Sequence, residues 1–255
     1  MDTTHIRSRT LTRVFTKLIV ALLFLSLCIG CSSASPTVFF GEDTGLGEST
    51  RLTSHPNSDA ARDAFLAQLV NPGTEDLEDF ADNTNAPLAV DFGAAGTATL
   101  KGSGFVIAVP TGTNGVGRFP ISGDNYWETG SEFYLEFTEP QAAFGFYGID
   151  VGDFQGQLTI TYEDGTTETV TVPHSVSTTG GTVIYYGFID LSHPFVKVTF
   201  GNTAAGVDYF GFDDFTIGTK EQVQDPEIPE FPTVALPVAA ILGLVFIFGR
   251  KKEGL

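Results

Sequence analysis

The chain has 255 residues and a formal net charge of −18, although only 17% of its residues are charged. Such an acidic chain has too few cations to neutralise phosphates, so nucleic acid is excluded as a partner. A hydrophobic content of 42% excludes a disordered chain, and the length allows one domain with appendages or two small domains.

The N-terminus has the three parts of an export signal. Four cations between residues 7 and 17 precede a predominantly apolar run over residues 18–30, and small residues follow. This order is typical of a secretory signal peptide, which we assign to residues 1–34. The sequence around Cys31 is also similar to a lipoprotein cleavage site, at which Cys31 would be lipidated. Cleavage after Ala34 is the alternative.

The C-terminus carries a second apolar segment. Residues 233–249 contain no charge, and three basic residues follow them. As a helix this segment would be about 25 Å long, which is near the lower limit for spanning a bilayer. The basic residues behind it predict a cytoplasmic C-terminus and a folded domain on the outside of the cell.

A short proline-containing motif precedes this segment; it consists of Pro229, Glu230, Phe231 and Pro232. The motif, the apolar helix and the basic tail together resemble the PEF-CTERM signal, an archaeal relative of the bacterial PEP-CTERM signal. The resemblance covers residues 229–255. It implies recognition by an archaeosortase/exosortase-type membrane transpeptidase that removes the helix and transfers the protein to a surface anchor. The alternative is a plain membrane anchor behind a proline-rich stalk.

One helix is predicted early in the region between the two ends. Capping residues at positions 55–59 precede apolar residues at helical spacing, which continue to Val70, and Pro72-Gly73 ends the pattern.

Strands are predicted in the rest of that region. Asp164-Gly165 predicts a hairpin between two of them. The expected strands cover residues 133–137, 142–149, 157–162, 167–172, 183–189, 195–200 and 212–217. Short strands at this spacing indicate an antiparallel β-sandwich with one short helix over residues 36–218, followed by an acidic, proline-containing linker at 219–228.

Several motifs of this domain resemble the ectodomain of PEP-CTERM surface proteins. They are Phe39–Asp43, the helix motif, Thr74–Glu78, Ala143–Asp150 and Asp208–Phe215. The resemblance implies a jelly-roll sandwich similar to carbohydrate-binding modules, and it leaves the biochemical role of the domain open.

No catalytic constellation is recognisable, so we expect the protein not to be an enzyme. The histidines at 55, 174 and 193 lie far apart, and neither a nucleophile elbow nor a phosphate-binding loop occurs. A glycan-acting hydrolase that uses two of the many carboxylates is the weaker alternative. Tyr126 and Trp127 follow a loop signal, so we expect them to be exposed and to stack on sugar rings. Packing of the two rings in the core is the alternative.

The surplus of carboxylates predicts a structural calcium ion. Residues 36–228 contain 28 Asp and Glu but only six Lys and Arg. Calcium binds six to eight oxygen ligands and needs neither His nor Cys. The expected ligands are Glu78, Asp150, Asp153, Asp213 and Asp214. The jelly-roll resemblance implies that Glu78 lies beside Asp213 or Asp214. Solvated carboxylates on turns and strand ends are the alternative.

Together these patterns predict an exported protein at the cell surface, anchored or sorted through its C-terminus. We expect it to have a structural role in the cell envelope or the extracellular matrix. A carbohydrate-binding module at the cell surface is the alternative.

Overall fold

The computed structural model describes residues 35–151, 156–173, 179–201 and 208–224. The predicted signal peptide, Cys31, the sorting motif Pro229–Pro232, the apolar segment 233–249 and Asp153 lie outside these residues. Among the helices within the described ranges, none is long and apolar enough to cross a membrane.

The described residues form a mostly β domain with one α-helix and two short 3-10 helices. The elements are β1 (Thr37–Asp43), α2 (Pro56–Leu66), β2 (Gly73–Glu75), β3 (Leu88–Asp91), η1 (Gly93–Ala95), β4 (Thr97–Gly102), β5 (Phe105–Ala108), β6 (Asn125–Thr129), β7 (Phe133–Gln141), β8 (Ala143–Ile149), β9 (Gln157–Tyr162), β10 (Thr167–Thr171), β11 (Val183–Ile189), β12 (Phe195–Gly201), β13 (Phe210–Gly218) and η2 (Lys220–Gln222).

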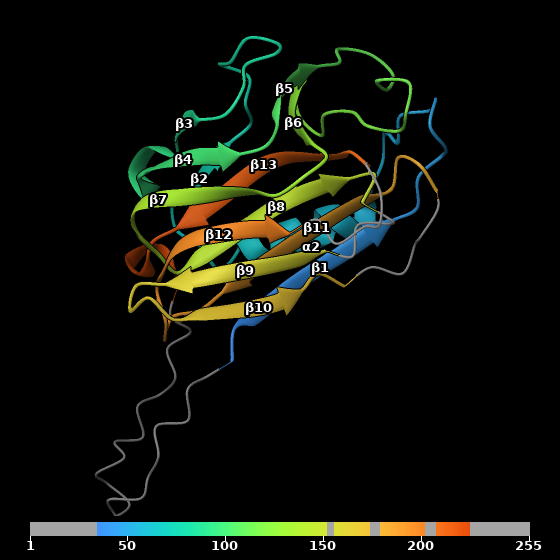
Figure 1. The fold of residues 1–255 in the computed structure, drawn as a ribbon. Coiled ribbons are helices and arrows are strands. Elements are labelled where there is room, and N and C mark those ends of the chain that lie inside the picture. Colours follow the sequence, from blue (N-terminus) through green and yellow to red (C-terminus); the bar gives the residue numbers. More distant parts are fainter. Residues whose placement is uncertain (1–34, 152–155, 174–178, 202–207, 225–255) are drawn as a thin grey trace, which may run out of the picture. The chain divides into compact units, whose positions relative to one another are not determined.

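The strands form two antiparallel sheets that lie face to face as layers (Figure 1). The first sheet has the order β1-β11-β8-β13-β6-β5, with β2 also paired to β13. The second sheet has the order β10-β9-β12-β7-β4-β3. The predicted antiparallel sandwich with one helix is confirmed.

Phenylalanine fills the space between the sheets. The rings of Phe133 and Phe200 stack with their centroids 4.2 Å apart. Phe146 and Phe212 close around this pair at centroid distances of 4.9 and 5.0 Å from Phe200. Because a buried aromatic side chain removes 150–250 Å² from water, the phenylalanines of this core stabilise the packing of the two sheets.

Helix α2 covers the outer face of the first sheet. Its buried Phe65 packs against Phe39 of β1 and Tyr185 of β11, with ring centroids 5.6 and 5.9 Å apart. The helix ends at Leu66, earlier than the predicted Val70. The reason is that the residues after it turn to join the C-terminal end of the domain.

The end of β1 caps this helix. The carboxylate of Asp43 accepts hydrogen bonds from the backbone N–H groups of Asn57 and Ser58, at 3.2 and 2.8 Å. Strand and helix approach closely here, since a Cβ added to Gly41 would lie 2.1 Å from the carbonyl oxygen of Asn57. Glycine at position 41 is therefore required by the packing of α2.

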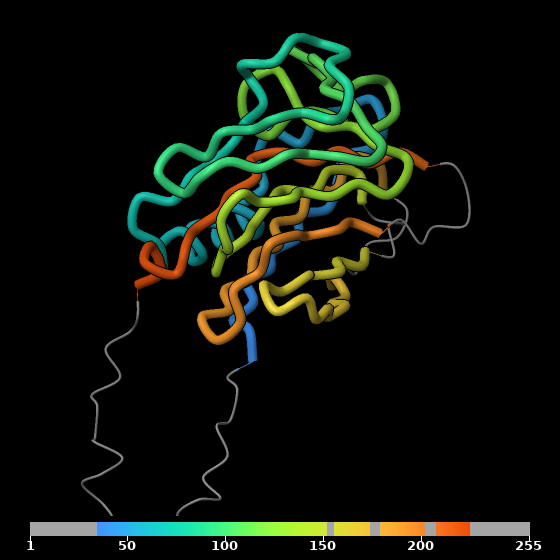
Figure 2. Tube along the Cα trace, turned by 60° about the vertical axis from the view of Figure 1, so that its left-hand side comes forward, coloured from blue at the N-terminus to red at the C-terminus, as the bar shows by residue number. Residues whose placement is uncertain are grey.

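The domain continues beyond Gly218, into residues that were expected to belong to the linker. Val223 is buried and forms a β-bridge with Leu69, and the N–H of Gln224 donates to the carbonyl of Gln68 at 2.7 Å. Figures 1 and 2 show that the two ends of the described domain, at residues 35 and 224, leave it on the same side.

Candidate functional site at the β5–β6 loop

The connection between β5 and β6, residues 109–124, is called the β5–β6 loop here. It lies on the side of the domain opposite to the two ends of the chain (Figure 1). Five carboxylates hold it in place, and they form two groups along the loop.

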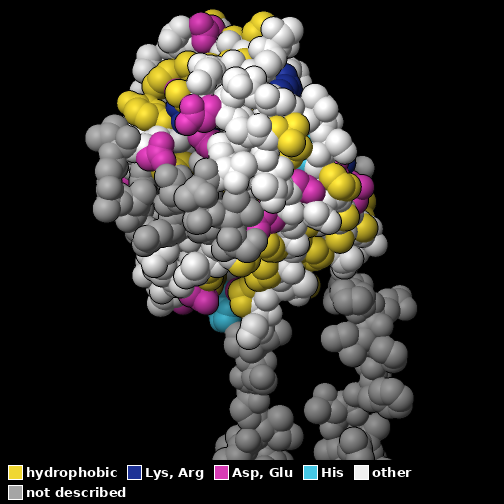
Figure 3. Space-filling model, turned by 90° about the vertical axis from the view of Figure 1, so that its right-hand side faces the viewer, with side chains coloured by type: hydrophobic (Ala, Val, Ile, Leu, Met, Phe, Trp, Pro, Cys, Tyr) yellow, Lys and Arg dark blue, Asp and Glu magenta, His cyan; other side chains and the backbone are white. Residues whose placement is uncertain are grey.

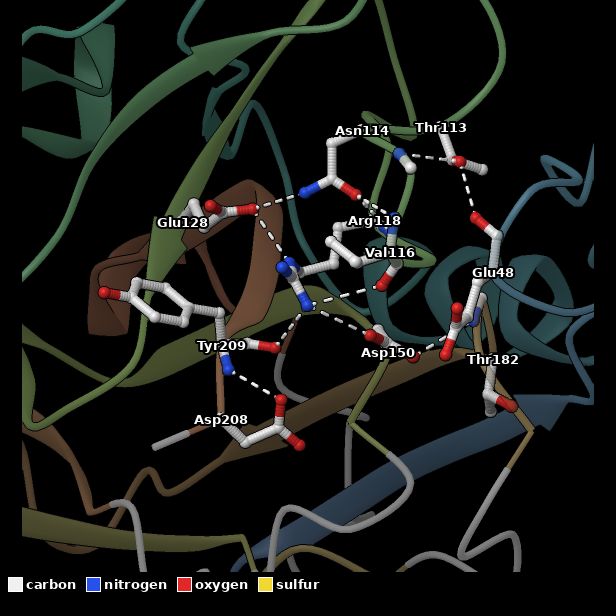
Figure 4. A network of polar contacts seen from close by, with 12 residues as sticks. Glu48, Thr113, Asn114, Val116, Arg118, Glu128, Asp150, Thr182, Asp208 and Tyr209 are labelled. Carbon is white, nitrogen blue, oxygen red and sulfur yellow. Dashed lines mark hydrogen bonds and ion pairs between the residues drawn. The ribbon is translucent and has the colours of Figure 1, made fainter. Parts of the chain in front are cut away.

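The first group surrounds Arg118 (Figure 4). The side chain of Arg118 is only 8% exposed and forms ion pairs with Glu128 at 2.8 Å and Asp150 at 3.2 Å. It also donates to the carbonyl oxygen of Tyr209 at 2.9 Å. Burial acts against the guanidinium charge, but Glu128 and Asp150 outweigh it and raise the pKa of Arg118. The guanidinium thus joins the loop to β6, to the end of β8 and to the start of β13.

Glu128 also gathers neutral donors. It accepts hydrogen bonds from the hydroxyl of Tyr126 at 2.7 Å and from the amide of Asn114 at 2.8 Å. Burial, and then the charge of Glu128, raise the pKa of Tyr126, so its phenol remains a donor. The amide oxygen of Asn114 in turn accepts the backbone N–H of Arg118 at 3.1 Å. This network fixes the first half of the loop.

The expected exposure of Tyr126 and Trp127 is wrong, because both residues are fully buried. Strand β6 is paired with β5 on one side and with β13 on the other, and all five of its residues are buried. Neither ring reaches solvent, so neither stacks on a sugar.

The second group of carboxylates holds the other half of the loop. Asp213 is fully buried and accepts hydrogen bonds from the N–H groups of Ile121 and Ser122, at 2.7 and 3.2 Å. Asp214 accepts the hydroxyl of Ser122 at 2.6 Å. Glu78 accepts the N–H groups of Asp124 and Asn125 at 2.8 and 2.7 Å.

The two aspartates of this group are electrostatically strained. Burial, and then the charge of Asp214, raise the pKa of Asp213 well above its usual value, against the effect of its backbone donors. Burial also raises the pKa of Asp214, and the charges of Asp76 and Glu78 add to this effect. Two of the acids that hold the loop, Asp213 and Asp214, are therefore destabilised by the fold in their charged form.

The residues predicted to bind calcium fall into separate places. Glu78, Asp213 and Asp214 hold the same half of the β5–β6 loop, whereas Asp150 is paired with Arg118. Within the described ranges, no three Asp, Glu, His or Cys side chains converge as a set of metal ligands. The calcium ion therefore stays a prediction.

Arg118 was not found from the sequence, although a signal was present. Residues 36–228 contain only six Lys and Arg beside 28 Asp and Glu, and Arg118 is one of the six. So rare a cation in an acidic domain could have been proposed as the partner of buried carboxylates. Its partners, however, lie up to 91 residues away along the chain.

Residues 228–252 match the family model of the PEF-CTERM archaeal protein sorting domain. This match confirms the resemblance that was inferred from Pro229–Pro232 and the apolar segment behind it. No curated protein matches the chain.

The sandwich is similar to several solved structures. The K2 cleaved adhesin domain of Lys-gingipain is 15% identical, with a TM-score of 0.37, and the match covers 58% of this chain and 99% of that one. A family 29 carbohydrate-binding module is 12% identical, with a TM-score of 0.28 and coverages of 76% and 97%. The C-terminal family 22 carbohydrate-binding module of Clostridium thermocellum Xyn10B is 14% identical, with a TM-score of 0.31 and coverages of 51% and 91%.

Proposed function

We propose that this protein is exported, sorted through its C-terminus and displayed at the cell surface, where its sandwich domain has a non-catalytic structural role in the envelope or extracellular matrix. The observation that carries the proposal is the match of residues 228–252 to the archaeal sorting domain. The matched segment follows the last described residue, Gln224, after only three residues. The sorting signal thus stands directly behind the folded domain.

The proposal implies two processing steps. A signal peptidase removes the N-terminal signal near Cys31 or Ser35, and an archaeosortase-type transpeptidase acts at the sorting motif. Mass spectrometry of native envelopes tests both. We expect the mature chain to end shortly before or within Pro229–Phe231, and the mass of its first peptide to distinguish lipidated Cys31 from a start at Ser35.

A matched pair of variants makes this experiment specific. Replacing Pro229, Glu230 and Phe231 together by alanine is expected to leave the chain unprocessed, with peptides that end at Leu255. Glu227→Ala, just outside the matched segment, is expected to be processed normally. Abundant peptides ending at Leu255 in the unaltered protein would rule out sorting and leave a plain membrane anchor.

Glycan binding is a second candidate, and Tyr209 favours it. Among the described residues Tyr209 is one of five large hydrophobic side chains that are exposed, and the guanidinium of Arg118 lies 5.9 Å from its ring centroid. Figure 4 shows the ring of Tyr209 near the side chain of Arg118. A fixed, exposed aromatic ring can stack on a sugar. Tyr209 therefore replaces Tyr126 and Trp127 as the stacking residue of this proposal.

A glycan array with the purified full chain tests this candidate. If the protein binds a glycan, Tyr209→Ala should weaken binding about tenfold or more, as expected for loss of about 1.4 kcal/mol or more of stacking energy. Val116→Ala, which changes another exposed side chain of the same region, should leave binding unchanged. If no glycan on the array binds, the second candidate function is rejected and the structural role is the function that is left.

A further inference from the structure

A cavity of about 330 Å³ opens between the edges of the two sheets, where β1 and β10 face each other without pairing. Its walls come from the inner faces of both sheets. Six of the residues that line it are Val38, Ile160, Glu168, Val170, Tyr186 and Phe188. Figure 3 shows the side toward which β1 and β10 point, where hydrophobic side chains lie toward the lower right of the face. The cavity is thus mainly apolar and open to solvent.

One tyrosine of the first sheet lines this cavity. Tyr186 is only 2% exposed, and its ring lies beside those of Phe146 and Phe188. Burial, and then the charge of Glu168, raise the pKa of Tyr186 to about 12, so the phenol is neutral and can donate. Glu168 accepts a hydrogen bond from the hydroxyl of Tyr162 at 2.6 Å. Among the described residues that line the cavity, it is the only charged one.

The two edges that border the cavity differ in how they are protected. Strand β10 ends the second sheet, and its exposed Glu168 is in register with the buried Ile160, which places a carboxylate on the inner side of this edge, at the mouth of the cavity. An inward charge of this kind discourages the pairing of a further strand. Strand β1 ends the first sheet and has neither proline nor lysine, and its Val38 is 50% exposed. Strand β1 is the unprotected edge.

We propose that β1 binds an extended, cationic segment of a partner protein as an additional strand of the first sheet. Over residues 37–40 of β1, alternate N–H and C=O groups point away from β11, toward the position of such a strand. The carbonyl oxygens of Gly41 and Glu42 already accept hydrogen bonds from Ser58 and Asn57 of α2, so pairing is confined to the start of β1. Side chains of the added strand opposite Val38 lie on the inner side, where an apolar one fills the cavity and approaches Tyr186. A basic side chain next to it pairs with Glu168.

The charge of the domain selects this partner over a second copy of the chain. With 28 acids and six cations between residues 36 and 228, two copies repel each other, whereas a basic segment is attracted.

Fluorescence anisotropy with the full chain in detergent micelles tests the proposal. The probe is a labelled nine-residue peptide of alternating pattern, Lys-Thr-Val-Thr-Phe-Thr-Val-Thr-Lys. We expect saturable binding that Val170→Lys weakens about tenfold or more, because a charged side chain then occupies the apolar cavity. Thr169→Lys adds the same charge to the opposite face of β10 and should change the affinity less than about twofold.

Two further measurements separate strand pairing from plain charge attraction. Glu168→Gln should weaken binding about threefold and reduce its dependence on salt, and it keeps the proposal testable if Val170→Lys does not fold. A peptide with proline in place of its central phenylalanine should not bind, because it can neither pair as a strand nor fill the cavity. Any of three results would overturn the proposal. The first is the absence of saturable binding, the second is an equal loss of affinity with Thr169→Lys and Val170→Lys, and the third is undiminished binding of the proline peptide. Dimers of the chain that Val170→Lys disrupts would assign the edge to a second copy and overturn it as well.

Discussion

Arg118 is the side chain on which the first half of the β5–β6 loop depends. Replacing it by methionine leaves the buried Glu128 and the partly buried Asp150 without their cation, which should destabilise the domain by about 3–5 kcal/mol. Denaturant unfolding measures this loss. Arg62→Met is the control, because Arg62 is 35% exposed and pairs with Asp63 at the surface, so its loss should cost less than about 1 kcal/mol. Equal losses would contradict the assigned role of Arg118.

The aspartates at the end of the loop predict a dependence of stability on pH. Because the pKa of Asp214 is raised above its usual 3.8, the folded state binds its proton more tightly than the unfolded state does. The free energy of unfolding should therefore increase as the pH falls from the raised pKa toward about 4. Asp214→Asn should reduce this increase, and urea midpoints between pH 4 and 7.5 at constant ionic strength measure it. An unchanged pH profile in the variant would contradict the prediction.

Calcium is tested in the same system. If Glu78, Asp213 and Asp214 bind the ion, millimolar calcium should raise the melting temperature at neutral pH, and Asp214→Asn should reduce that rise. Magnesium and high sodium are the controls for general screening. An equal rise of the melting temperature with sodium would mean that the salt only screens the repulsion between these carboxylates and that they do not bind calcium specifically.

At the scale of residues, the sequence predicts which side chains lie together only where those side chains belong to one motif or to a recognised family resemblance. The resemblance implied that Glu78 lies beside Asp213 or Asp214, and in the structure all three accept hydrogen bonds from the β5–β6 loop. The loop signal before Tyr126 correctly indicated a turn, but it predicted exposure because it contains no information about β13. That strand begins more than 80 residues later and covers β6.

Strand β1 and helix α2 approach each other closely at Gly41, where no room is left for a side chain. Gly41→Ala should destabilise the domain by about 1–3 kcal/mol, because the added methyl group would lie 2.1 Å from the backbone oxygen of Asn57. Gly201→Ala is the matched control in another strand, where the nearest atom to the new Cβ is 3.7 Å away. Its effect should stay below about 0.5 kcal/mol. If thermal unfolding shows similar losses of stability for Gly41→Ala and Gly201→Ala, the helix can move away from β1 at little cost, which would contradict the prediction.

At the scale of elements, the second half of the sandwich was predictable and the first half was not. Strands such as β8 and β11 are seven-residue apolar runs, so their pattern is visible without knowledge of the fold. Strands β2 and β5 have three and four residues, too few for a periodicity. They are strands because they pair with β13 and β6, and these contacts cannot be seen in the sequence.

The whole domain should unfold in a single transition. Strand β1 pairs with β11, β2 and β6 pair with β13, and β4 pairs with β7, so both sheets combine early and late parts of the chain. Such interleaving leaves no segment with a core of its own, which favours two-state unfolding. Calorimetry of the full chain should show one endotherm for the domain. Two separate endotherms would mean that the sheets fold independently.

The placement of the two chain ends has a consequence for the proposed display at the cell surface. Residues 35 and 224 leave the domain on one side, and the β5–β6 loop lies on the opposite side (Figure 2). If the chain is tethered behind Gln224, the β5–β6 loop would point away from the tether, toward the surroundings. The edges of the two sheets would then face neighbouring molecules of the layer, so that a slender extended chain could reach β1 while a large particle could touch only the outer loops.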